Sequence, residues 1–416
     1  MSKQLNKKYL LNESKCFCMA PWMHMNVWPS GETFPCCVAE NQKENYGNIN
    51  QKSIYDLWNS NLAKELRTNM LNETYSEVCY KCYELEKANI GSLRKRLNKD
   101  YSHHIESVQN TLESGQHNRP NFAYMDIRFS NLCNMSCRTC TPSFSSKWYD
   151  DFLKAYGKVD PSVAPSKLIQ LKILDKLKPY LQDVEEIYWA GGEPLIMKEH
   201  WDIMNILLDI GKSNSIDVRY NTNLSSLYFK NLSILDLWKK FKYITISASL
   251  DGQHKRAEYI RKGTKWPSII SNMQTILKSK LNVRIEISPT ISILNIWHLP
   301  DFHRDWVEQK LVKNCTDFKY FNFLIDPTCF SIQVLPKNIK QKITKKWNDH
   351  INWIKDLNIE LSYIDQCYSV IEYMNLHDKS NLLIETKKEL EKFDKVRNEN
   401  WQDYLPELLF LENIHE

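Results

Sequence analysis

From Asn121 onward the chain alternates short β-rich runs with longer helical patterns. Such alternation is the signature of repeated β-α units, which build a parallel sheet. Amphipathic helical patterns occupy 168–181, 200–208 and 269–281. Many of the runs are apolar on both faces, which predicts helices over both sides of the sheet. Six runs are candidate strands: Phe122–Ser130, Val184–Ala190, Ile216–Asn221, Tyr243–Ser249, Val283–Ile291 and Phe318–Ile325.

The segments on either side of this repeat have different patterns. Before residue 121 the chain is turn-rich up to about Asn50, and then helical at 53–71 and around 83–98. After about Pro336 the pattern is long, charged and helical, without a glycine. We therefore predict three regions, at 1–120, 121–335 and 336–416. In parallel α/β folds the chemistry lies on loops at the carboxyl ends of the strands, so functional residues are expected there.

Charge and hydropathy narrow the class of protein. The 55 basic and 50 acidic residues leave a net charge of only +5, without a basic stripe, so we do not expect a nucleic-acid partner. The N-terminus lacks the apolar stretch of a secretory signal, and no run of about 18 apolar residues occurs. These features predict a cytoplasmic protein without a membrane partner. Disulfides are not expected in a reducing compartment, so the twelve cysteines call for another explanation.

Nine of the twelve cysteines precede residue 141, and three of them share one short loop, Cys133-x3-Cys137-x2-Cys140. Three thiolates can ligate three irons of a [4Fe–4S] cluster and leave the fourth iron open to another ligand. The loop follows the first candidate strand, where a catalytic loop is expected. On spacing alone, a structural zinc knuckle or buried thiols remain alternatives.

A second motif, Ala-Gly-Gly-Glu-Pro-Leu at 190–195, follows the next candidate strand. Two glycines let the backbone approach a ligand closely, and a carboxylate can hold a cationic amine. A zinc knuckle needs neither feature. Together, the cysteine triad and Gly-Gly-Glu one β-α unit later resemble the radical S-adenosylmethionine (radical SAM) superfamily.

That resemblance implies a partial (β/α)6 radical SAM barrel at 121–335. In the family, the cluster cleaves SAM to a 5′-deoxyadenosyl radical, and the ends of later strands hold the ribose and carboxylate of SAM. The corresponding turns here are also ordinary turn sequences. Thr139 stands before the third cysteine, where the family often has an aromatic residue near adenine. The resemblance implies these SAM contacts: Gly191, Gly192, Glu193, Asn221, Asn223, Ser249, Asp251 and Thr290.

The N-terminal region carries a second set of cysteines that can fully coordinate another [4Fe–4S] cluster, or equally a zinc ion. The pattern Cys-x12-Gly-x4-Cys with a later Cys-x2-Cys resembles the SPASM/twitch auxiliary-cluster module. That module usually follows the barrel, whereas here it precedes it, and the cysteines suffice for one cluster. Cys16 and Cys37 compete as ligands with two of the predicted four: Cys18, Cys36, Cys79 and Cys82.

The resemblance implies two [4Fe–4S] clusters, SAM as cofactor, an electron donor such as flavodoxin or ferredoxin, and a peptide or protein substrate. One alternative is a radical SAM dehydrogenase or epimerase of a small molecule, such as a sugar or nucleotide. An alternative from another class is a non-enzymatic, zinc-stapled binding protein. The histidines, including His103 and His104, show no helix-face pairing with an acidic residue, so we predict surface or core roles for them.

Overall fold

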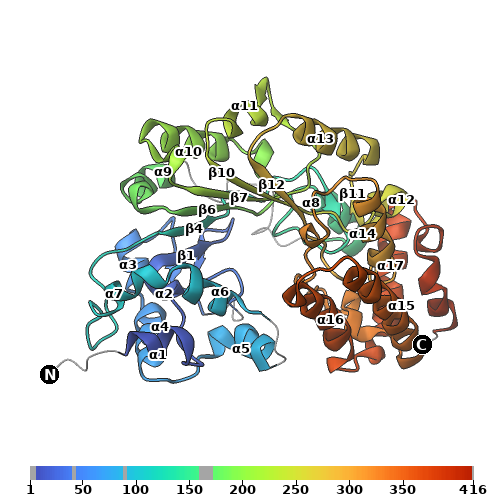
Figure 1. Cartoon of the computed structure of the whole chain (residues 1–416), viewed down its shortest axis with the longest axis horizontal. Coiled ribbons are helices and arrows are strands. Elements are labelled where there is room, and N and C mark those ends of the chain that lie inside the picture. The colour runs from blue at the N-terminus through green and yellow to red at the C-terminus, as the bar shows by residue number, and fades with distance from the viewer. Residues whose placement is uncertain (1–5, 40–43, 88–90, 159–171, 415–416) are drawn as a thin grey trace.

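A computed structural model describes residues 6–39, 44–87, 91–158 and 172–414. A twisted sheet forms the top of an arch in Figure 1, with the N-terminal region below one end and the C-terminal helices below the other. Within the described residues no helix combines the length and apolar character needed to cross a bilayer. The predicted boundaries near residues 120 and 335 remain predictions.

The main sheet has eight strands in the order β12-β10-β7-β6-β4-β1-β2-β3. From β12 to β1 all neighbours are parallel, while β2 (Glu32–Phe34) and β3 (Gly47–Asn48) continue the sheet antiparallel. The parallel strands are β1 (His24–Val27), β4 (Tyr124–Ile127), β6 (Glu186–Trp189), β7 (Asp217–Thr222), β10 (Tyr243–Ala248) and β12 (Val283–Ile287).

Strand β1 belongs to the cysteine-rich N-terminal region, yet it pairs in parallel with β4, with Asn26 opposite Asp126. The sequence pattern did not predict this strand, because its pairing partner lies about a hundred residues away. The N-terminal region is therefore continuous with the sheet through backbone hydrogen bonds.

The prediction of a strand at Phe318–Ile325 was wrong. Only two isolated parallel bridges, Ile287 with Phe318 and Ile291 with Phe323, connect this segment to the strand before it. Pro289 lies between the two bridged positions and has no backbone N–H to donate, so a continuous ladder does not form there.

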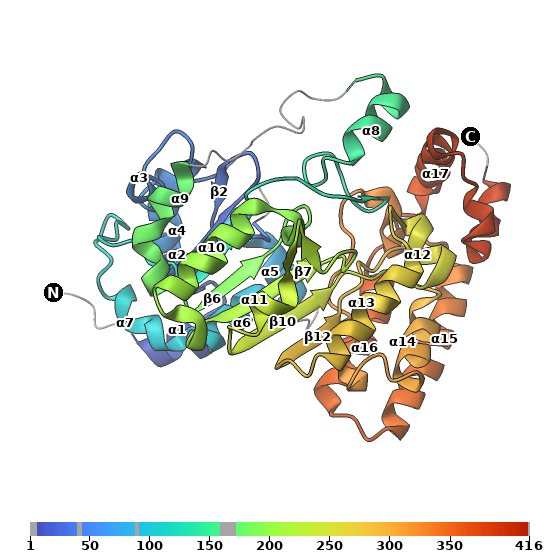
Figure 2. The same ribbon diagram turned by 90° about the horizontal axis from the view of Figure 1, so that it is seen from above.

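The two faces of the sheet differ in polarity. The outer face carries apolar side chains such as Met125, Ile187 and Val218, which pack in the main core. Four helices cover this face in Figures 1 and 2: α9 (Lys172–Leu177), α10 (Lys198–Asp209), α11 (Ile234–Trp238) and α13 (Trp266–Lys278).

The opposite, inner face carries polar side chains, including Asp126, Arg219 and Ser247. The prediction that the strands are apolar on both faces was therefore wrong for this sheet. Among the described residues, α6 (Leu93–Asp100) contacts the inner face through Arg96, which stacks on Tyr124 and pairs with Glu186, but no full layer of helices covers this side as it does the outer one (Figure 1).

The N-terminal helices agree in place with the predicted helical patterns, but the segment at 53–71 is two helices rather than one. The side chains of Ser53 and Ser60 each accept a hydrogen bond from a backbone N–H three residues later, so each begins a helix. The helices of this region are α1 (Lys7–Asn12), α2 (Ala20–Met23), α3 (Ile54–Trp58), α4 (Asn61–Leu71), α5 (Tyr80–Lys87), α6 (Leu93–Asp100) and α7 (Ile105–Val108).

The C-terminal region is helical, as the sequence predicts. Its aromatic and aliphatic side chains, Trp347 and Leu390 among them, continue the main hydrophobic core. The remaining helices are α8 (Trp148–Tyr156), α12 (His254–Ile260), α14 (Leu299–Glu308), α15 (Lys337–Asp356), α16 (Leu361–Leu376) and α17 (Leu383–Arg397).

Candidate functional site

The loop with Cys133, Cys137 and Cys140 begins just beyond the carboxyl end of β4. Burial, followed by the like charge of the Cys137 thiol, raises the pKa of Cys133 to about 12 and that of Cys140 to about 12. The three thiols therefore lie within electrostatic reach of one another. Buried thiols that raise each other's pKa are stabilised as thiolates by a bound cation or cluster.

Neighbouring elements hold this loop in place. Cys137 lies in the two-residue strand β5 (Ser136–Cys137), which pairs antiparallel with β11 (Arg261–Lys262), so that Cys137 faces Arg261. The Arg261 guanidinium donates to Cys137 Sγ at 3.8 Å. On the other side, Trp148 Nε1 donates to the Cys137 carbonyl at 2.7 Å.

The Gly-Gly-Glu turn lies directly against the cysteine loop. The backbone N–H of Glu193 donates to the Leu132 carbonyl at 2.8 Å. Gly192 has φ +45°, and a Cβ added there would lie 2.2 Å from the same carbonyl oxygen. Only glycine permits this approach, which places the Glu193 carboxylate beside Cys133.

Glu193 is buried, and its carboxylate is fixed by hydrogen bonds. It accepts from Thr222 Oγ1 at 2.7 Å, from the Asn223 N–H at 2.8 Å and from the Leu195 N–H at 3.2 Å. Burial raises the pKa of Glu193, while these hydrogen bonds oppose the rise. An ionised carboxylate offers about four acceptor positions, so one position remains for a ligand such as an amine.

The other predicted SAM contacts fall into two groups. Asn221 is the last residue but one of β7, and Asn223 follows the end of this strand. Asn223 Nδ2 donates to Asn134 Oδ1 of the cysteine loop at 2.9 Å. Ser249 lies beside them, since its N–H donates to the Thr222 carbonyl at 2.8 Å.

Asp251 and Thr290 form the second group, and there the Asp251 carboxylate already has protein partners. Asp251 Oδ1 accepts from the Thr290 N–H at 2.7 Å and from Arg261 Nη2 at 3.0 Å. The sequence analysis missed Arg261, because no motif marks it and it lies 124 residues from Cys137. Asp251 thus fixes the arginine that donates to a cysteine of the loop.

The four predicted auxiliary ligands gather in the N-terminal region. The pKa of Cys36 is raised well above its usual value, mainly by burial. The next largest contributions to this rise come from neighbouring thiols, those of Cys37, Cys82, Cys79 and Cys18. Burial also raises the pKa of Cys79 to about 12, with Cys82 as the next contribution.

The two competing cysteines have other main neighbours. After burial, the largest influences on the pKa of Cys37, which is raised to about 11, are Asp126 and Arg128 on the inner face of the sheet. The pKa of Cys16 is also raised by burial, and the largest influences on it after burial are Glu73 and Arg94. The choice of the four ligands stays a prediction.

The spacing of the thiols bears on what each set can hold. In a tetrahedral zinc site with Zn–S bonds of about 2.3 Å, neighbouring sulfurs are about 3.8 Å apart. Among the described residues, no three cysteine sulfurs come within 4.8 Å of one another. In the part of the chain that the structure describes, neither set is therefore arranged as a closed zinc site.

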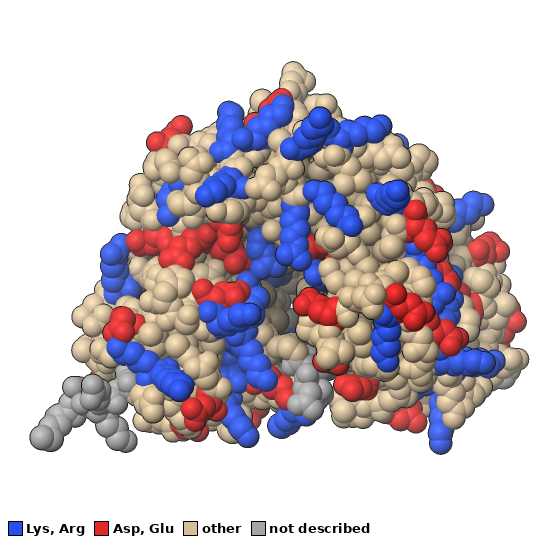
Figure 3. Space-filling model, viewed as in Figure 1, with Lys and Arg blue, Asp and Glu red and all other residues tan. Residues whose placement is uncertain are grey.

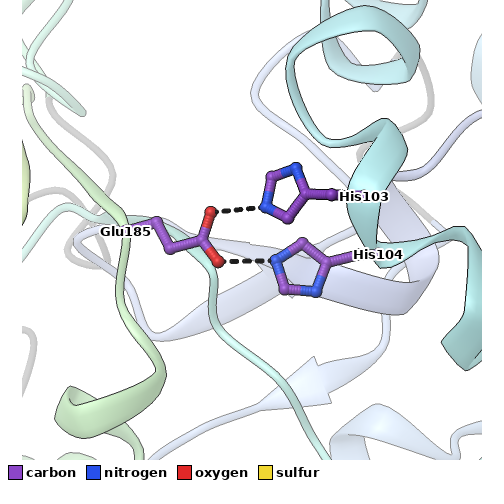
Figure 4. A group of neighbouring side chains, drawn as sticks. All are labelled: His103, His104 and Glu185. Carbon is purple, nitrogen blue, oxygen red and sulfur yellow. Dashed lines mark hydrogen bonds and ion pairs between the residues drawn. The ribbon is translucent and has the colours of Figure 1, made fainter.

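The described residues hold one group of three ligand atoms within 4.8 Å, and it lies away from the cysteines: His103, His104 and Glu185 (Figure 4). Each imidazole Nε2 is 2.8 Å from a different Glu185 oxygen. Side-chain exposure of 54% for His103 and 40% for Glu185 indicates a surface ion pair. The acidic partner lies some eighty residues away, so the sequence could not reveal it.

Charged residues of the C-terminal region also bind the cysteine loop. Arg138, whose side chain is 1% exposed, donates to Asp394 at 2.5 Å and to Glu399 at 2.9 Å. Arg397 Nη2 donates to the Ser136 carbonyl at 2.8 Å. Residues on both sides of Cys137 are thus anchored to the end of α17 and the turn after it.

A parallel α/β sheet with three cysteines on the loop after β4, a buried carboxylate beside them and a second group of cysteines in the N-terminal region is typical of an iron–sulfur protein. Comparison with protein families agrees with this class. The model of the radical SAM superfamily matches residues 127–308, and that of the SPASM iron–sulfur cluster-binding domain matches residues 16–83. The chain therefore combines a radical SAM domain with an N-terminal SPASM module, and [4Fe–4S] clusters and SAM are the cofactors that these domains bind.

Solved structures similar to this chain include anSMEcpe with bound AdoMet and the Cp18Cys peptide, at 16% identity and a TM-score of 0.40, covering 55% of this chain and 60% of that one. SuiB of Streptococcus suis bound to its precursor peptide SuiA is 18% identical, with a TM-score of 0.34, covering 67% of this chain and 58% of that one. The chain thus spans about half to three fifths of these proteins. No curated protein matches it.

Proposed function

We propose that this enzyme cleaves SAM reductively and uses the resulting radical to remove a hydrogen atom from a carbon of a peptide or protein. The [4Fe–4S] cluster supplies the electron for SAM cleavage when both are bound. Cys133, Cys137 and Cys140 are proposed to hold it. The observation that carries the proposal is the contact of the Gly-Gly-Glu turn with Leu132, which sets a buried carboxylate beside a cysteine triad.

Each residue of this turn has a role that its surroundings support. Gly192 allows the backbone of the turn to approach the cysteine loop. Glu193 retains one free acceptor position, which we assign to the amine of SAM as a charge-assisted hydrogen bond. Asn221, Asn223 and Ser249 are proposed to contact the rest of SAM, and the hydrogen bond of the Asn223 N–H to Glu193 supports this assignment.

The N-terminal thiols Cys18, Cys36, Cys79 and Cys82 are proposed to hold a second cluster. Four protein ligands leave no open iron, so this cluster suits electron transfer or the shaping of the substrate site.

A substrate as large as a peptide is supported by the shape of the molecule. Figure 3 shows a hollow beneath the sheet, between the N-terminal region and the C-terminal helices, with Lys and Arg side chains along part of its rim. The half-buried inner-face residues Tyr188, Arg219 and Thr245 lie on the sheet that roofs this space. Enzymes with SPASM or twitch modules, which this sequence resembles, most often modify peptides.

We also propose a flavodoxin or ferredoxin as electron donor and the cytoplasm as the compartment. None of the twelve cysteines forms a disulfide among the described residues, and a reducing compartment keeps thiols available as cluster ligands.

Replacing Cys133, Cys137 and Cys140 together with Ala tests the proposed function. The variant should lose about four of about eight irons per chain and form no 5′-deoxyadenosine. The matched control replaces Cys315, Cys329 and Cys367, three buried thiols of the C-terminal half, and should keep iron and SAM cleavage. Full SAM cleavage by the first variant would contradict the proposal.

The substrate is tested by following deuterium from labelled candidates into 5′-deoxyadenosine, under anaerobic conditions with reductant and SAM. Transfer from a peptide supports the proposal. Transfer only from a sugar or nucleotide would instead indicate a small-molecule dehydrogenase or epimerase.

A further inference from the structure

Four polar side chains form a group on the inner face of β1 and β4, which we call the inner-face group: His24, Asn26, Asp126 and Arg128. Asn26 stands opposite Asp126 in the parallel register, and His24 and Arg128 lie two residues away on the same face. His24, Asn26 and Asp126 are each 0% exposed. A sheet face that served packing alone would carry apolar residues at these positions.

Among the described residues, Asp126 Oδ2, Asn26 Oδ1 and His24 Nε2 have no hydrogen-bond partner, and Asp126 Oδ1 and Arg128 Nε have only each other, at 3.5 Å. His24 Nδ1 lies 2.8 Å from the Tyr124 carbonyl, which only accepts, so Nδ1 carries the proton and Nε2 is an acceptor. Leaving such atoms buried and unpaired costs about 1–3 kcal/mol for each group, so a structural role does not account for them.

The inner-face group lies between the two cysteine sets. A Cβ added at Gly191 of the Gly-Gly-Glu turn would be 2.8 Å from Arg128 Cβ, which brings the arginine against the proposed SAM site. On the other side, Cys37, the neighbour of the proposed ligand Cys36, interacts electrostatically with Asp126 and Arg128. The Arg128 side chain is 17% exposed and so reaches from the buried carboxylate toward the surface.

The charges within the group balance. Arg128 Nε lies 3.5 Å from Asp126 Oδ1 and forms an ion pair with it, and the nearby Arg96 is paired with Glu186 at 3.4 Å. A ligand with a net charge would leave an uncompensated charge at a buried site, which is strongly unfavourable. The unpaired acceptors Asp126 Oδ2, Asn26 Oδ1 and His24 Nε2, together with the guanidinium of Arg128, match a neutral group with N–H donors and a carbonyl.

We infer that the inner-face group is a substrate-recognition site for a neutral amide, either the carboxamide of an Asn or Gln side chain or a peptide bond of the main chain. The amide N–H groups donate to Asp126 and its neighbouring acceptors, and the amide carbonyl accepts from Arg128. This inference rests on the proposed function, since it places the amide beside the SAM site of a peptide-modifying enzyme.

Binding of labelled pentapeptides to the anaerobic holoenzyme with SAM tests the inference by fluorescence anisotropy. The peptides have the sequence Ala-Ala-X-Ala-Ala, with Gln, Glu, Lys or Met as X, and a fifth peptide carries an N-methylated central amide. The wild type should bind the Gln peptide about tenfold more tightly than the Glu and Lys peptides, as one charge-assisted hydrogen bond would produce. If the four peptides that differ at X bind equally tightly and the N-methylated peptide binds more weakly, the group that the site recognises is the main-chain amide.

Two substitutions should then change the preference in opposite directions. Asp126→Asn leaves Arg128 without its counter-ion and should shift preference toward the Glu peptide. Arg128→Gln leaves Asp126 unpaired and should shift preference toward the Lys peptide. The matched control, Asp236→Asn, removes one exposed carboxylate from helix α11 on the outer side and should leave the ranking unchanged.

Iron content and circular dichroism verify that each variant folds, and a shift in one properly folded variant suffices. The inference is overturned if the wild type binds the Glu or Lys peptide most tightly, if no peptide binds, or if neither variant changes the ranking. These outcomes are distinct from failure of the proposed function, which would appear as SAM cleavage without the cysteine triad.

Discussion

Glu193 combines burial with a full set of constraints on its carboxylate. Three donors fix its oxygens, and the preceding glycine allows it to stand against the cysteine loop. A turn residue with only a structural role would need none of these partners, because it would be solvated. The arrangement instead preorganises a charged acceptor for one remaining donor.

Glu193→Ala should therefore weaken SAM binding by about tenfold to a hundredfold, the loss expected for a hydrogen bond to a charged group. Equilibrium dialysis with labelled SAM measures this change. Iron content should stay normal, since Glu193 is not among the proposed cluster ligands.

Glu199→Ala is the matched control for this variant, because Glu199 lies in the first turn of α10, only six residues further along the chain. Its affinity for SAM should equal that of the wild type. If the Glu193→Ala variant bound SAM as tightly as the wild type, Glu193 would be only a turn residue.

At the scale of elements, the C-terminal helices hold the catalytic loop. Asp394 accepts from Arg138 and also from the Tyr259 hydroxyl at 2.9 Å, and Arg397 donates to Asp151 at 3.0 Å. Buried ion pairs add little net stability, but removal of one partner leaves an uncompensated charge that costs about 3–5 kcal/mol. This network therefore positions the loop more than it stabilises the fold.

Asp394→Asn should loosen the cysteine loop and release iron faster from the Cys133 set, because Arg138 loses a buried counter-ion. Iron release to a chelator should become biphasic, with about half of the iron, one cluster of two, leaving early. The exposed Asp403→Asn in the following turn is the control and should release iron as the wild type does. If the Asp394→Asn variant released iron as slowly as the wild type, the C-terminal helices would not hold the loop.

Local patterns in the sequence predicted most of the elements but not how distant elements meet. The runs at Val184–Ala190 and Tyr243–Ser249 became strands, because β-rich composition and flanking helices determine them locally. Strand β1 was missed because its hydrogen-bonding partner is far away in sequence. The strand expected at Phe318–Ile325 failed because periodicity does not show that a proline interrupts the ladder.

In the candidate site, too, local motifs in the sequence indicated some residues and missed others. The cysteine triad and Glu193 stand at short, fixed spacings, so motifs could reveal them. Arg261, which contacts Cys137, and Asp394, which binds Arg138, come from elements brought close only by the tertiary fold. No periodicity marks such residues, and the partners of Asp251 were likewise not visible in the sequence.

At the scale of the whole molecule, the arch brings the two cysteine sets to the same sheet. β1 follows Cys18 closely, and β2 ends two residues before Cys36, so the four-cysteine module is built onto the edge of the barrel sheet. The inner-face group lies on β1 and β4 of this sheet, with Gly191 of the Gly-Gly-Glu turn near Arg128 and Cys37 near Asp126. A second cluster at this place would be close to a substrate bound under the sheet.

Changing Cys79 and Cys82 together to Ala should separate the roles of the two clusters. Iron should fall from about eight to about four per chain, and uncoupled SAM cleavage should continue, because the Cys133 loop and Glu193 are untouched. Product formation should stop, since the second cluster is proposed to serve the substrate rather than SAM. Iron analysis, 5′-deoxyadenosine assays and mass spectrometry of the peptide measure the three effects.

The same variant also tests whether the second cluster only staples the N-terminal region. In that case the region would unfold, circular dichroism would change and SAM cleavage would be lost together with product, because β1 is hydrogen-bonded to β4 below the catalytic loop. The control variant Cys16→Ala removes a nearby thiol whose main neighbours are Glu73 and Arg94, and should keep about eight irons. Normal product formation by a folded, four-iron Cys79/Cys82 variant would contradict both roles.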